Sequence, residues 1–235
     1  MDKNYSLRIA EQFYSLQGEG KTMGVPAVFV RLQACNILCK GEWICDTIEV
    51  WKTGNKTTIH DWLYSIRFWI KNLKDGAHLI FTGGEPLLQQ KQIVNAVKIF
   101  TRLLGFKPFV EIETNGTIMP SEELLDTVDL FNCSFKLKNS GVRKDRRLKY
   151  DVLKKLNNYN TIYKIVISST IDFIEAKEIF DEVGIKNKDV WLMPAGDNYD
   201  DIIKTNKIVA NICIIYTMNF STRLQVVLWN KTTGV

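Results

Sequence analysis

Short apolar segments alternate with longer amphipathic ones along most of the chain, and the two kinds predict different elements. The short segments, bounded by turn residues, predict strands over Ile9–Tyr14, Ala27–Gln33, His78–Thr82, Phe109–Glu113, Leu130–Phe135, Thr161–Ser168, Val190–Met193 and Leu224–Trp229. The longer ones predict helices over Ile59–Leu73, Gln89–Leu104, Ser121–Thr127, Arg147–Asn157, Phe173–Glu182 and Asp200–Tyr216. This repeated order of strand and helix predicts an α/β fold with a mostly parallel sheet and outer helices.

Polar or glycine-rich turns directly follow five of the predicted strands. They contain the cysteine loop after Gln33, then Gly83-Gly84-Glu85-Pro86, Thr114-Asn115-Gly116, Lys136 with Asn139-Ser140-Gly141, and Met193-Pro194-Ala195-Gly196. In parallel sheets, ligands collect at the carboxyl ends of the strands. We therefore expect the five turns to form one site on a single rim of the fold.

The size and composition of the chain are those of a globular domain. With 235 residues, 46% hydrophobic and 24% charged, we expect residues 1–235 to form a single domain. No run of 18 or more residues is wholly apolar, and the first residues, Met1-Asp2-Lys3-Asn4, are polar. We therefore expect no membrane span, no signal peptide and a cytoplasmic location.

Part of the net charge of +5 comes from one basic cluster. It consists of Arg143, Lys144, Arg146, Arg147 and Lys149. Since no aromatic residue stands among them to stack on bases, we favour a solvated loop and helix start over a nucleic-acid patch. We expect no nucleic-acid partner.

The five cysteines fall into two groups. Cys133 and Cys213 stand in apolar stretches, which predicts small buried side chains. Cys35, Cys39 and Cys45 lie within eleven residues, and an odd cysteine count in a cytoplasmic chain argues against a disulfide framework. Three soft thiolates on one loop suit zinc or an iron–sulfur cluster with one open metal position. The alternatives are a zinc site completed by a distant ligand, or cysteines of the core.

A second motif narrows these alternatives. Gly83-Gly84-Glu85-Pro86 follows the cysteines after about forty residues, at the end of a predicted strand. Its glycines allow close approach of the backbone to a ligand, and its acid can accept hydrogen bonds from an ammonium group. Alone, the motif would be a turn before a helix. Together with the cysteine triplet, it resembles the radical-SAM superfamily, whose members use S-adenosylmethionine (SAM).

Further segments resemble one family within that superfamily, the 7-carboxy-7-deazaguanine synthases. In chain order they are Phe13–Gly20, Gly24–Leu32, Cys45-Asp46-Thr47, Phe81–Leu87, Glu113–Thr117, Ser134–Leu137, and Arg223–Trp229 with the terminal Gly234-Val235. The resemblance spans nearly the whole chain. It implies a 4Fe–4S cluster and Mg²⁺, and an activity in which a 5′-deoxyadenosyl radical takes a hydrogen from 6-carboxy-5,6,7,8-tetrahydropterin. Ring contraction and loss of ammonia would give 7-carboxy-7-deazaguanine, in queuosine-type or modified-DNA biosynthesis.

The resemblance also implies residue roles, none of them a catalytic acid or base. Substrate contacts are implied for Leu16, Gln17, Gly18, Glu19, Arg31, Thr82 and the C-terminal Val235. SAM contacts are implied for Ile44, Gly84, Glu85, Ser134, Phe135 and Lys136. Cys35, Cys39 and Cys45 would hold three irons of the cluster, and Thr47 would bind Mg²⁺. The planar guanidinium of Arg31 suits the substrate carboxylate.

Several of these residues have simpler interpretations. Arg31 could be a surface charge on a strand, and Thr47 could cap a turn. Glu111 and Glu113 share one face of a strand, which could be a paired-acid site or a solvated face. Trp43 could shield the cluster or be a core aromatic.

The chain also departs from the family pattern. Five residues separate Cys39 from Cys45 where the family has two, so Lys40-Gly41-Glu42 resembles an insertion. Phe135 stands where the family has proline, and Gln225 replaces a frequent histidine. Thr232-Thr233 precede Gly234 in place of a basic residue.

The resemblance implies a partial, open (β/α) barrel of the radical-SAM type, a homodimer, and a reductant protein such as flavodoxin. Two other functions stay open. One is a radical-SAM activase that abstracts hydrogen from a partner protein, and the other is a zinc-bound module without catalysis. Gln17, Glu19 and Thr47 favour the pterin enzyme over the activase.

Overall fold

The computed structural model describes residues 5–43, 45, 47–196 and 198–230, and within them the chain forms one sheet. Its strands are β1 (Ser6–Leu16), β2 (Pro26–Leu32), β3 (Asn55–Thr58), β4 (His78–Gly83), β5 (Phe109–Thr114), β6 (Leu130–Cys133), β7 (Thr161–Ile167), β8 (Val190–Pro194) and β9 (Asn219–Phe220). Their spatial order is β3-β1-β2-β4-β5-β6-β7-β8-β9. The pairs formed by β1 with β2 and β3 are antiparallel, and all later pairs are parallel. The predicted α/β class with a mostly parallel sheet is confirmed.

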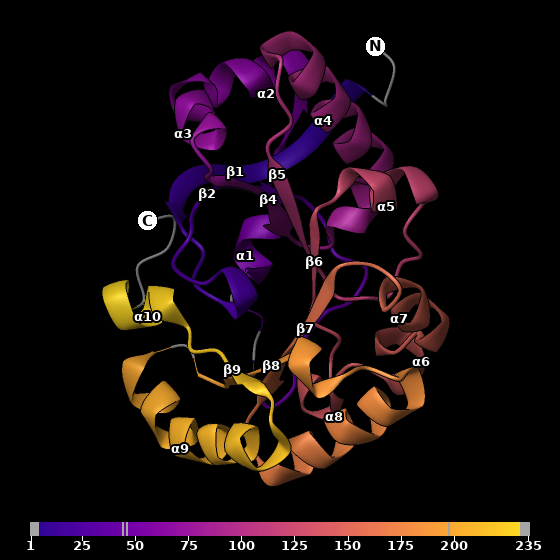
Figure 1. Cartoon of the computed structure of the whole chain (residues 1–235), viewed down its shortest axis with the longest axis vertical. Coiled ribbons are helices and arrows are strands. Elements are labelled where there is room, and N and C mark those ends of the chain that lie inside the picture. Colours follow the sequence, from indigo (N-terminus) through magenta and orange to yellow (C-terminus); the bar gives the residue numbers. More distant parts are fainter. Residues whose placement is uncertain (1–4, 44, 46, 197, 231–235) are drawn as a thin grey trace.

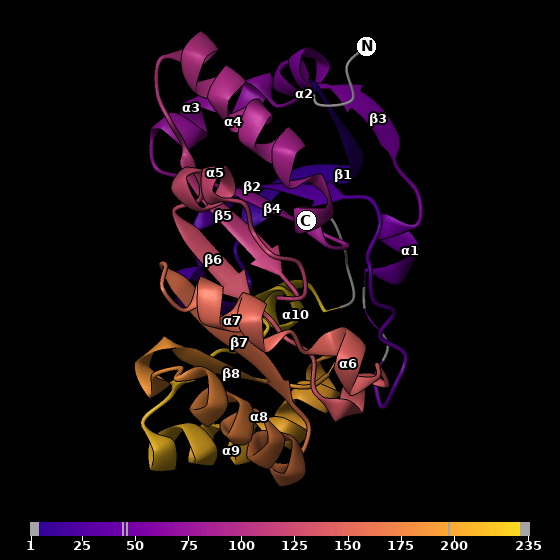
Figure 2. The ribbon, with the colours of Figure 1, turned by 90° about the vertical axis from the view of Figure 1, so that its right-hand side faces the viewer.

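Most of the helices lie on the outer face of this curved sheet, and the last of them lies on its inner side (Figures 1 and 2). They are α1 (Ile48–Trp51), α2 (Ile59–Ser65), α3 (Ile70–Lys74), α4 (Gln90–Leu104), α5 (Glu122–Thr127), α6 (Lys144–Arg147), α7 (Tyr150–Leu156), α8 (Thr170–Val183), α9 (Tyr199–Tyr216) and α10 (Leu224–Trp229). The start of α10 contacts the segment after β1, where the Leu224 amide donates to the Gly18 carbonyl at 2.9 Å. The two sides of the open sheet are thereby linked. No helix in the described part of the chain is long and apolar enough to cross a membrane.

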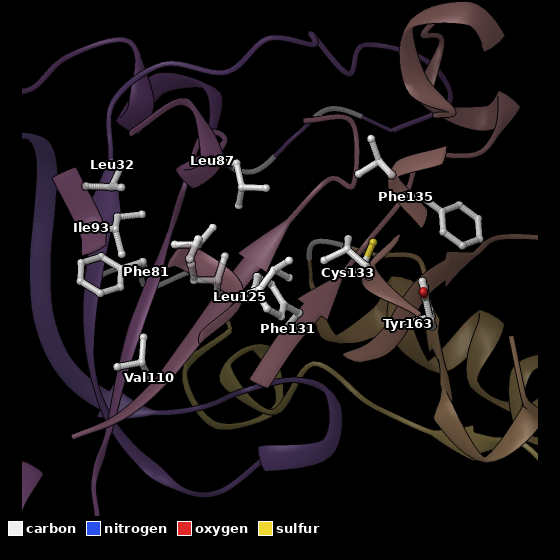
Figure 3. Packing of buried hydrophobic residues seen from close by; sticks show 14 of the residues in the cluster. Leu32, Phe81, Leu87, Ile93, Val110, Leu125, Phe131, Cys133, Phe135 and Tyr163 are labelled. Carbon is white, nitrogen blue, oxygen red and sulfur yellow. The ribbon is translucent and has the colours of Figure 1, made fainter. Parts of the chain in front are cut away.

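Alternating residues of the central strands face either the outer helices or the interior of the curve. Val110 and Ile112 of β5 belong to the main core, whereas Glu111 between them does not. In β7, Tyr163 and Ile165 are core residues on either side of Lys164. Figure 3 shows this core, where side chains from several strands pack against those of α4 and α5. The interior face of the same strands therefore carries the polar residues.

The predicted strand over Leu224–Trp229 is wrong, because this segment forms α10. A short apolar run has no period that separates a strand from a helix. Here the helix buries Val226 and leaves Val227 and Leu228 exposed, and Leu224 is tied to Gly18 rather than to a neighbouring strand. The other seven predicted strands are confirmed, with small shifts of their ends.

Two predicted helices are broken in the structure. The helix over Ile59–Leu73 is interrupted by a 3-10 turn at Arg67–Trp69, next to the Ser65 hydroxyl, which donates to the Trp62 carbonyl at 2.6 Å. Such side-chain bonds compete with the helical backbone. The helix expected over Arg147–Asn157 begins only at Tyr150. Arg147 ends α6 instead, because its buried guanidinium binds the carbonyls of Lys136 and Val142.

Candidate active site

The Gly83-Gly84 turn after β4 holds the start of the cysteine loop. The Gly84 amide donates to the Leu32 carbonyl at 3.0 Å, and the Glu85 amide donates to the Ala34 carbonyl at 2.9 Å. A Cβ at position 84 would lie 1.8 Å from the Ala34 oxygen, and Gly83 has a φ of +108°. Both positions therefore need glycine. The motif fixes where the loop leaves β2.

The Glu85 carboxylate links this turn to the next one. It is fully buried and accepts hydrogen bonds from Thr114 Oγ1 at 2.8 Å, the Asn115 amide at 2.8 Å and the Leu87 amide at 3.0 Å. Burial raises the pKa of Glu85, and the two backbone donors oppose that shift. The side chain predicted to contact SAM thus accepts three hydrogen bonds from the protein. These bonds hold the turn after β4 against the turn after β5.

The three clustered cysteines are free thiols on the loop between β2 and α1. Cys39 is buried, and its carbonyl accepts from the Cys45 amide at 3.3 Å. Asn115 Nδ2 lies 3.8 Å from Cys35 Sγ, and burial raises the pKa of Cys35 to about 11. Among the described residues, no group of three or more acidic, histidine or cysteine side chains is arranged to hold a single metal ion. Three free thiols on one loop nevertheless suit a cluster, which spreads its ligands over several irons.

Thr47 lies between the cysteine loop and the glycine turn. Its hydroxyl donates to the Gly83 carbonyl at 3.3 Å and is 3.3 Å from Cys45 Sγ. The predicted Mg²⁺ ligand is therefore at the same rim as the thiols.

The extra residues of the cysteine loop pack on the turn after β6. We call Lys40–Trp43 the clasp. The Lys40 amide donates to the Ser140 carbonyl at 3.1 Å, and the Glu42 amide donates to the Asn139 carbonyl at 2.8 Å. A Cβ on Gly41 would lie 2.2 Å from the Asn139 carbonyl oxygen. The clasp thus makes a specific contact with this turn.

Trp43 of the clasp connects to the residues predicted to flank SAM. Its indole nitrogen donates to Asn139 Oδ1 at 3.1 Å, and Lys136 Nζ lies 5.8 Å from the ring centre. A small hollow in this region is lined by Trp43, Ser134, Phe135, Lys136, Leu137, Asn139 and Val166. The Phe135 ring itself packs in the core against Tyr163, as Figure 3 shows.

The interior of the curved sheet holds a hydrogen-bonded group that we call the interior polar cluster. Its members are Gln17, Glu19, Thr82, Glu111, Glu113, Lys164, Arg223 and Gln225. Lys164 Nζ lies 2.5 Å from Glu19 Oε2 and 3.4 Å from Glu113 Oε1. The Thr82 hydroxyl donates to Glu113 Oε2 at 2.6 Å. Residues predicted for substrate contact on two separate segments, Gln17 with Glu19 and Thr82, are thus brought together.

Glu19 is the most heavily bonded acid of the cluster. Besides Lys164, it accepts from Arg223 Nε at 3.1 Å and Gln225 Nε2 at 2.7 Å. Burial alone would raise the pKa of Glu19, but the charges of Lys164 and Arg223 outweigh it and hold the pKa well below its ordinary value. Burial would likewise lower the pKa of Lys164, yet Glu113 and Glu19 raise it. Both groups are therefore charged at neutral pH.

Glu111 and Glu113 face the interior together, as the interpretation of a paired-acid site required. Glu111 is fully buried and accepts from Gln17 Nε2 at 3.2 Å, Thr22 Oγ1 at 2.9 Å and Asn132 Nδ2 at 3.3 Å. The side chain of Glu113 is 24% exposed. The pair therefore lies on the interior face of the sheet, with Glu111 buried and Glu113 partly exposed.

Arg31 lies beside this cluster on β2, paired in register with Thr82 of β4. Its guanidinium donates to Glu11 Oε1 at 2.6 Å and stacks over the Phe13 ring at 5.1 Å. Its side chain is 20% exposed, so the alternative of a solvated surface charge is wrong.

The remaining predicted residues differ in what the structure shows. Leu16 ends β1 and is half-buried, and Gly18 is buried against Gln225, whose Oε1 lies 1.9 Å from the position of a Cβ on Gly18. Ile44 and Val235 lie outside the described residues.

Sequence reasoning missed Lys164, Arg223 and Gln225 as members of the site. A lysine inside the apolar strand Thr161–Ile167 was the available signal, because a cation is rarely buried without a carboxylate partner. Gln225 stands in the segment predicted as a strand, and Arg223 directly precedes it, which concealed the position of both residues. Burial of Cys133 and Cys213 was predicted correctly.

Three comparisons with known proteins each found a match. A family model described as a 4Fe-4S single cluster domain matches residues 16–149. The 7-carboxy-7-deazaguanine synthase of Halobacterium salinarum is 32% identical over 96% of this chain and 91% of its own length. That of Pyrobaculum aerophilum is 30% identical over 97% of both chains. The crystal structure of QueE from Escherichia coli shares the fold, with a TM-score of 0.67 at 22% identity over 95% of this chain and 99% of that one.

Proposed function

The chain belongs to the 7-carboxy-7-deazaguanine synthase family of radical-SAM enzymes, and from this premise we propose that it converts 6-carboxy-5,6,7,8-tetrahydropterin to 7-carboxy-7-deazaguanine with loss of ammonia. The observation that carries the proposal is the interior polar cluster. It places buried acids, an amide and a nearby guanidinium in one interior, below the rim that holds the three thiols. A reduced pterin carries the matching groups, which are ring N–H donors and a carboxylate.

The interior polar cluster fits a donor-rich heterocycle. Gln225 Oε1 is buried and has no hydrogen-bond partner among the described residues. An orphan acceptor of this kind costs free energy until a donor reaches it. Glu19, Glu111 and Glu113 supply further acceptor oxygens on neighbouring segments. We propose that N–H groups of the pterin donate to Gln17, Glu19 and Gln225.

Arg31 is proposed to bind the substrate carboxylate. Its guanidinium has five N–H donors in a planar fork, and the contact with Glu11 uses one nitrogen, Nη1. Thr82, opposite Arg31 in the β2–β4 register, would hold the same end of the substrate through its hydroxyl. Leu16, Gly18 and the carboxylate of Val235 are proposed to complete the contacts.

The cofactors are proposed to bind at the rim. Cys35, Cys39 and Cys45 would hold a 4Fe–4S cluster, and SAM would lie along Gly84, Glu85, Ser134, Phe135, Lys136 and the Ile44 backbone. When bound, the cluster and SAM supply the radical that takes hydrogen from the substrate. The chain's own part is to orient the pterin and keep it from water. Thr47 is proposed as a Mg²⁺ ligand, because a hydroxyl oxygen suits this hard ion.

An anaerobic turnover assay tests the proposal. The protein is reconstituted with iron and sulfide, then mixed with SAM, dithionite, Mg²⁺ and 6-carboxy-5,6,7,8-tetrahydropterin. We expect the mass of 7-carboxy-7-deazaguanine to appear, and Arg31→Gln to raise the KM for this substrate more than tenfold, because a charged hydrogen bond is lost. A brown protein that yields only 5′-deoxyadenosine would refute the substrate. A colourless protein that holds zinc would refute the cofactor.

A further inference from the structure

The turn after β5 places the buried Asn115 side chain against the cysteine loop. Two contacts fix the backbone of this turn. The Asn115 amide donates to Glu85 Oε2 at 2.8 Å. Gly116 has a φ of +70°, and a Cβ on it would lie 2.8 Å from Cys133 Sγ, so the position needs glycine. The Asn115 side chain therefore leaves the turn in a fixed direction.

Three side chains form a closed ring of hydrogen bonds between this turn and the cysteine loop. We call Asn36, Asn115 and Thr117 the amide ring. Asn115 Nδ2 donates to Asn36 Oδ1 at 3.0 Å, and Asn36 Nδ2 donates to the Thr117 hydroxyl at 2.7 Å. This hydroxyl donates in turn to Asn115 Oδ1 at 2.5 Å. Since Arg146 Nη2 also donates to the Asn36 carbonyl at 2.8 Å, the residue that follows Cys35 is held on two sides.

The amide ring also decides which atom of the Asn115 amide faces Cys35. The Thr117 backbone N–H can only donate, and it donates to Asn115 Oδ1 at 3.0 Å. The other end of the amide is therefore the nitrogen, which has two N–H groups. One of them donates to Asn36 Oδ1, and Cys35 Sγ lies 3.8 Å from the same nitrogen. The second N–H thus donates to the sulfur of a proposed cluster ligand.

The other surroundings of Cys35 disfavour negative charge on its sulfur. Burial raises the pKa of the thiol, and the nearby Glu85 carboxylate raises it further. A hydrogen bond from the Ile37 backbone amide acts in the opposite direction. An iron–sulfur cluster gains one negative charge when it is reduced, so burial and the Glu85 charge would make its reduction harder. A donor to a ligand sulfur makes reduction easier, because hydrogen bonds to the sulfurs help to set the potential of a cluster.

We propose that Asn115 donates a hydrogen bond to the 4Fe–4S cluster through the sulfur of Cys35 and thereby raises the reduction potential of the cluster. The proposal rests on the cofactor part of the proposed function, in which Cys35, Cys39 and Cys45 hold this cluster. Asn115 acts through Cys35, so it is a positioning residue. In the step that it affects, the cluster gains one electron, the reductant loses one, and no bond is made or broken.

The competing interpretation is that Asn115 only shapes its turn. A side-chain oxygen that accepts from the backbone amide two residues later forms an Asx turn, and Asn115 Oδ1 makes this contact with Thr117. That role needs the acceptor oxygen and not the N–H groups. Aspartate keeps the oxygen and loses the N–H groups, whereas leucine, of similar size, loses both. The two interpretations therefore predict different effects of these substitutions on the cluster.

A redox titration of the reconstituted protein, without SAM or pterin, tests the proposal. Asn115→Leu removes the donor to Cys35 without adding charge. Its matched control is Thr117→Val, which also opens the amide ring without adding charge and leaves the Asn115 amide in place. Asn115→Asp and Asn36→Asp form a second pair, in which each variant adds one carboxylate to the ring and only the first removes the N–H from Cys35. Titanium(III) citrate is the reductant, and visible absorbance with electron paramagnetic resonance gives the midpoint potential.

We expect each Asn115 variant to have an equilibrium constant for cluster reduction at least about tenfold lower than its control, which is about 59 mV for a one-electron couple. Thr117→Val should keep the wild-type potential. If Asn115→Leu loads no iron, the aspartate pair decides, because Asn115→Asp keeps the acceptor that shapes the turn. Equal potentials within the neutral pair, or within the aspartate pair, would overturn the proposal and leave Asn115 a residue that shapes its turn.

Product formation separates this inference from the proposed function. If the wild type forms 7-carboxy-7-deazaguanine and the potentials within each pair are equal, the role of Asn115 is wrong and the function stands. If the potentials differ as expected and no deazaguanine forms, the substrate is wrong and the role of Asn115 stands. A wild-type protein that holds no cluster after reconstitution would overturn both.

Discussion

Lys164 is the buried cation that joins the carboxylates of the interior polar cluster. It lies in the middle of a buried strand, with 6% of its side chain exposed, and it contacts Glu19 and Glu113 from other segments. A cation in such a place is stable only with its partners, because burial otherwise removes its hydration. The lysine therefore fixes both carboxylates on the interior side of the sheet.

Removal of Lys164 should be costly. Lys164→Met leaves Glu19 and Glu113 without their shared cation, and we expect the free energy of unfolding to fall by about 3–5 kcal/mol. The matched control is Lys71→Met, whose ion pair with Asp75 is exposed and whose loss should leave the free energy of unfolding nearly unchanged. Urea denaturation of the apoprotein measures both. Similar losses in the two variants would contradict a buried role for Lys164.

Glu19 should control how the free energy of unfolding changes with pH under acid conditions. Its folded pKa lies below the ordinary value of 4.5, so its contribution is full above that pH and is lost as the pH falls toward the folded pKa. Glu19→Gln cannot lose a proton in this range, and the slope of its unfolding free energy against pH should be shallower below about pH 4.5. Denaturation at a series of pH values checks this, with Glu123→Gln, an exposed acid, as control. An unchanged slope in Glu19→Gln would show that Lys164 and Arg223 do not hold the carboxylate charged.

The clustered cysteines and the core cysteines should differ in whether the protein needs them to bind iron. Cys39→Ala should abolish cluster loading and leave the fold intact, because the remaining two thiols cannot hold the cluster. Cys133→Ala removes an equally buried thiol that packs in the core, and it should keep its iron. Iron content and the visible spectrum after reconstitution measure the difference, with far-ultraviolet circular dichroism as the check on folding. Full iron in Cys39→Ala would remove it from the ligand set.

At the scale of elements, the clasp joins two parts of the rim of the site. Two backbone hydrogen bonds and the contact of Gly41 with the turn at Asn139–Gly141 join the cysteine loop to the segment after β6. Gly141 has a φ of +72°, and a Cβ placed on it would lie 2.9 Å from the Cα of Gly41. The close approach leaves no room for a side chain on either residue.

Gly41→Ala should therefore open the clasp. The new methyl group would lie 2.2 Å from the Asn139 oxygen, so the loop must move. We expect faster loss of iron from the reconstituted protein and faster reaction of the apoprotein's Cys39 with a thiol reagent. Gly76→Ala is the control, because a Cβ there has nothing within 4 Å although its φ of +108° is strained. If Gly41→Ala retained iron and thiol protection like Gly76→Ala, the clasp would have no part in holding the loop.

The elements also show where sequence patterns suffice. Strand β4 was predicted closely because its middle is a continuous apolar run, and β5 because its apolar residues alternate with Glu111 and Glu113 between turn residues. Strand β3, Asn55–Thr58, was missed because it is a polar edge strand, and α10 was mistaken for a strand because its apolar run is short. The break between α2 and α3 depends on a side-chain bond from Ser65 that periodicity does not encode.

At the scale of the whole molecule, the rim of the site and three interior residues, Gln17, Glu19 and Thr82, could be predicted, whereas their partners Lys164 and Arg223 could not. The thiols, the glycine turn and Thr47 were found because motifs mark them in sequence. The bonds from Lys164 and Arg223 to Glu19 span 145 and 204 residues of chain, so only the curvature of the sheet brings these groups together. The single domain, the homodimer and the Mg²⁺ site stay predictions.

The central claim is that chemistry begun at the thiol rim acts on a pterin held in the interior. The most direct measurement uses 6-carboxy-5,6,7,8-tetrahydropterin that carries deuterium on the reduced carbons of its ring, with mass spectrometry of the adenosyl group after turnover. We predict that deuterium appears in recovered SAM or 5′-deoxyadenosine from the wild type, and that Cys39→Ala transfers none. Adenosyl products free of deuterium, formed while this substrate is present in excess, would contradict the account.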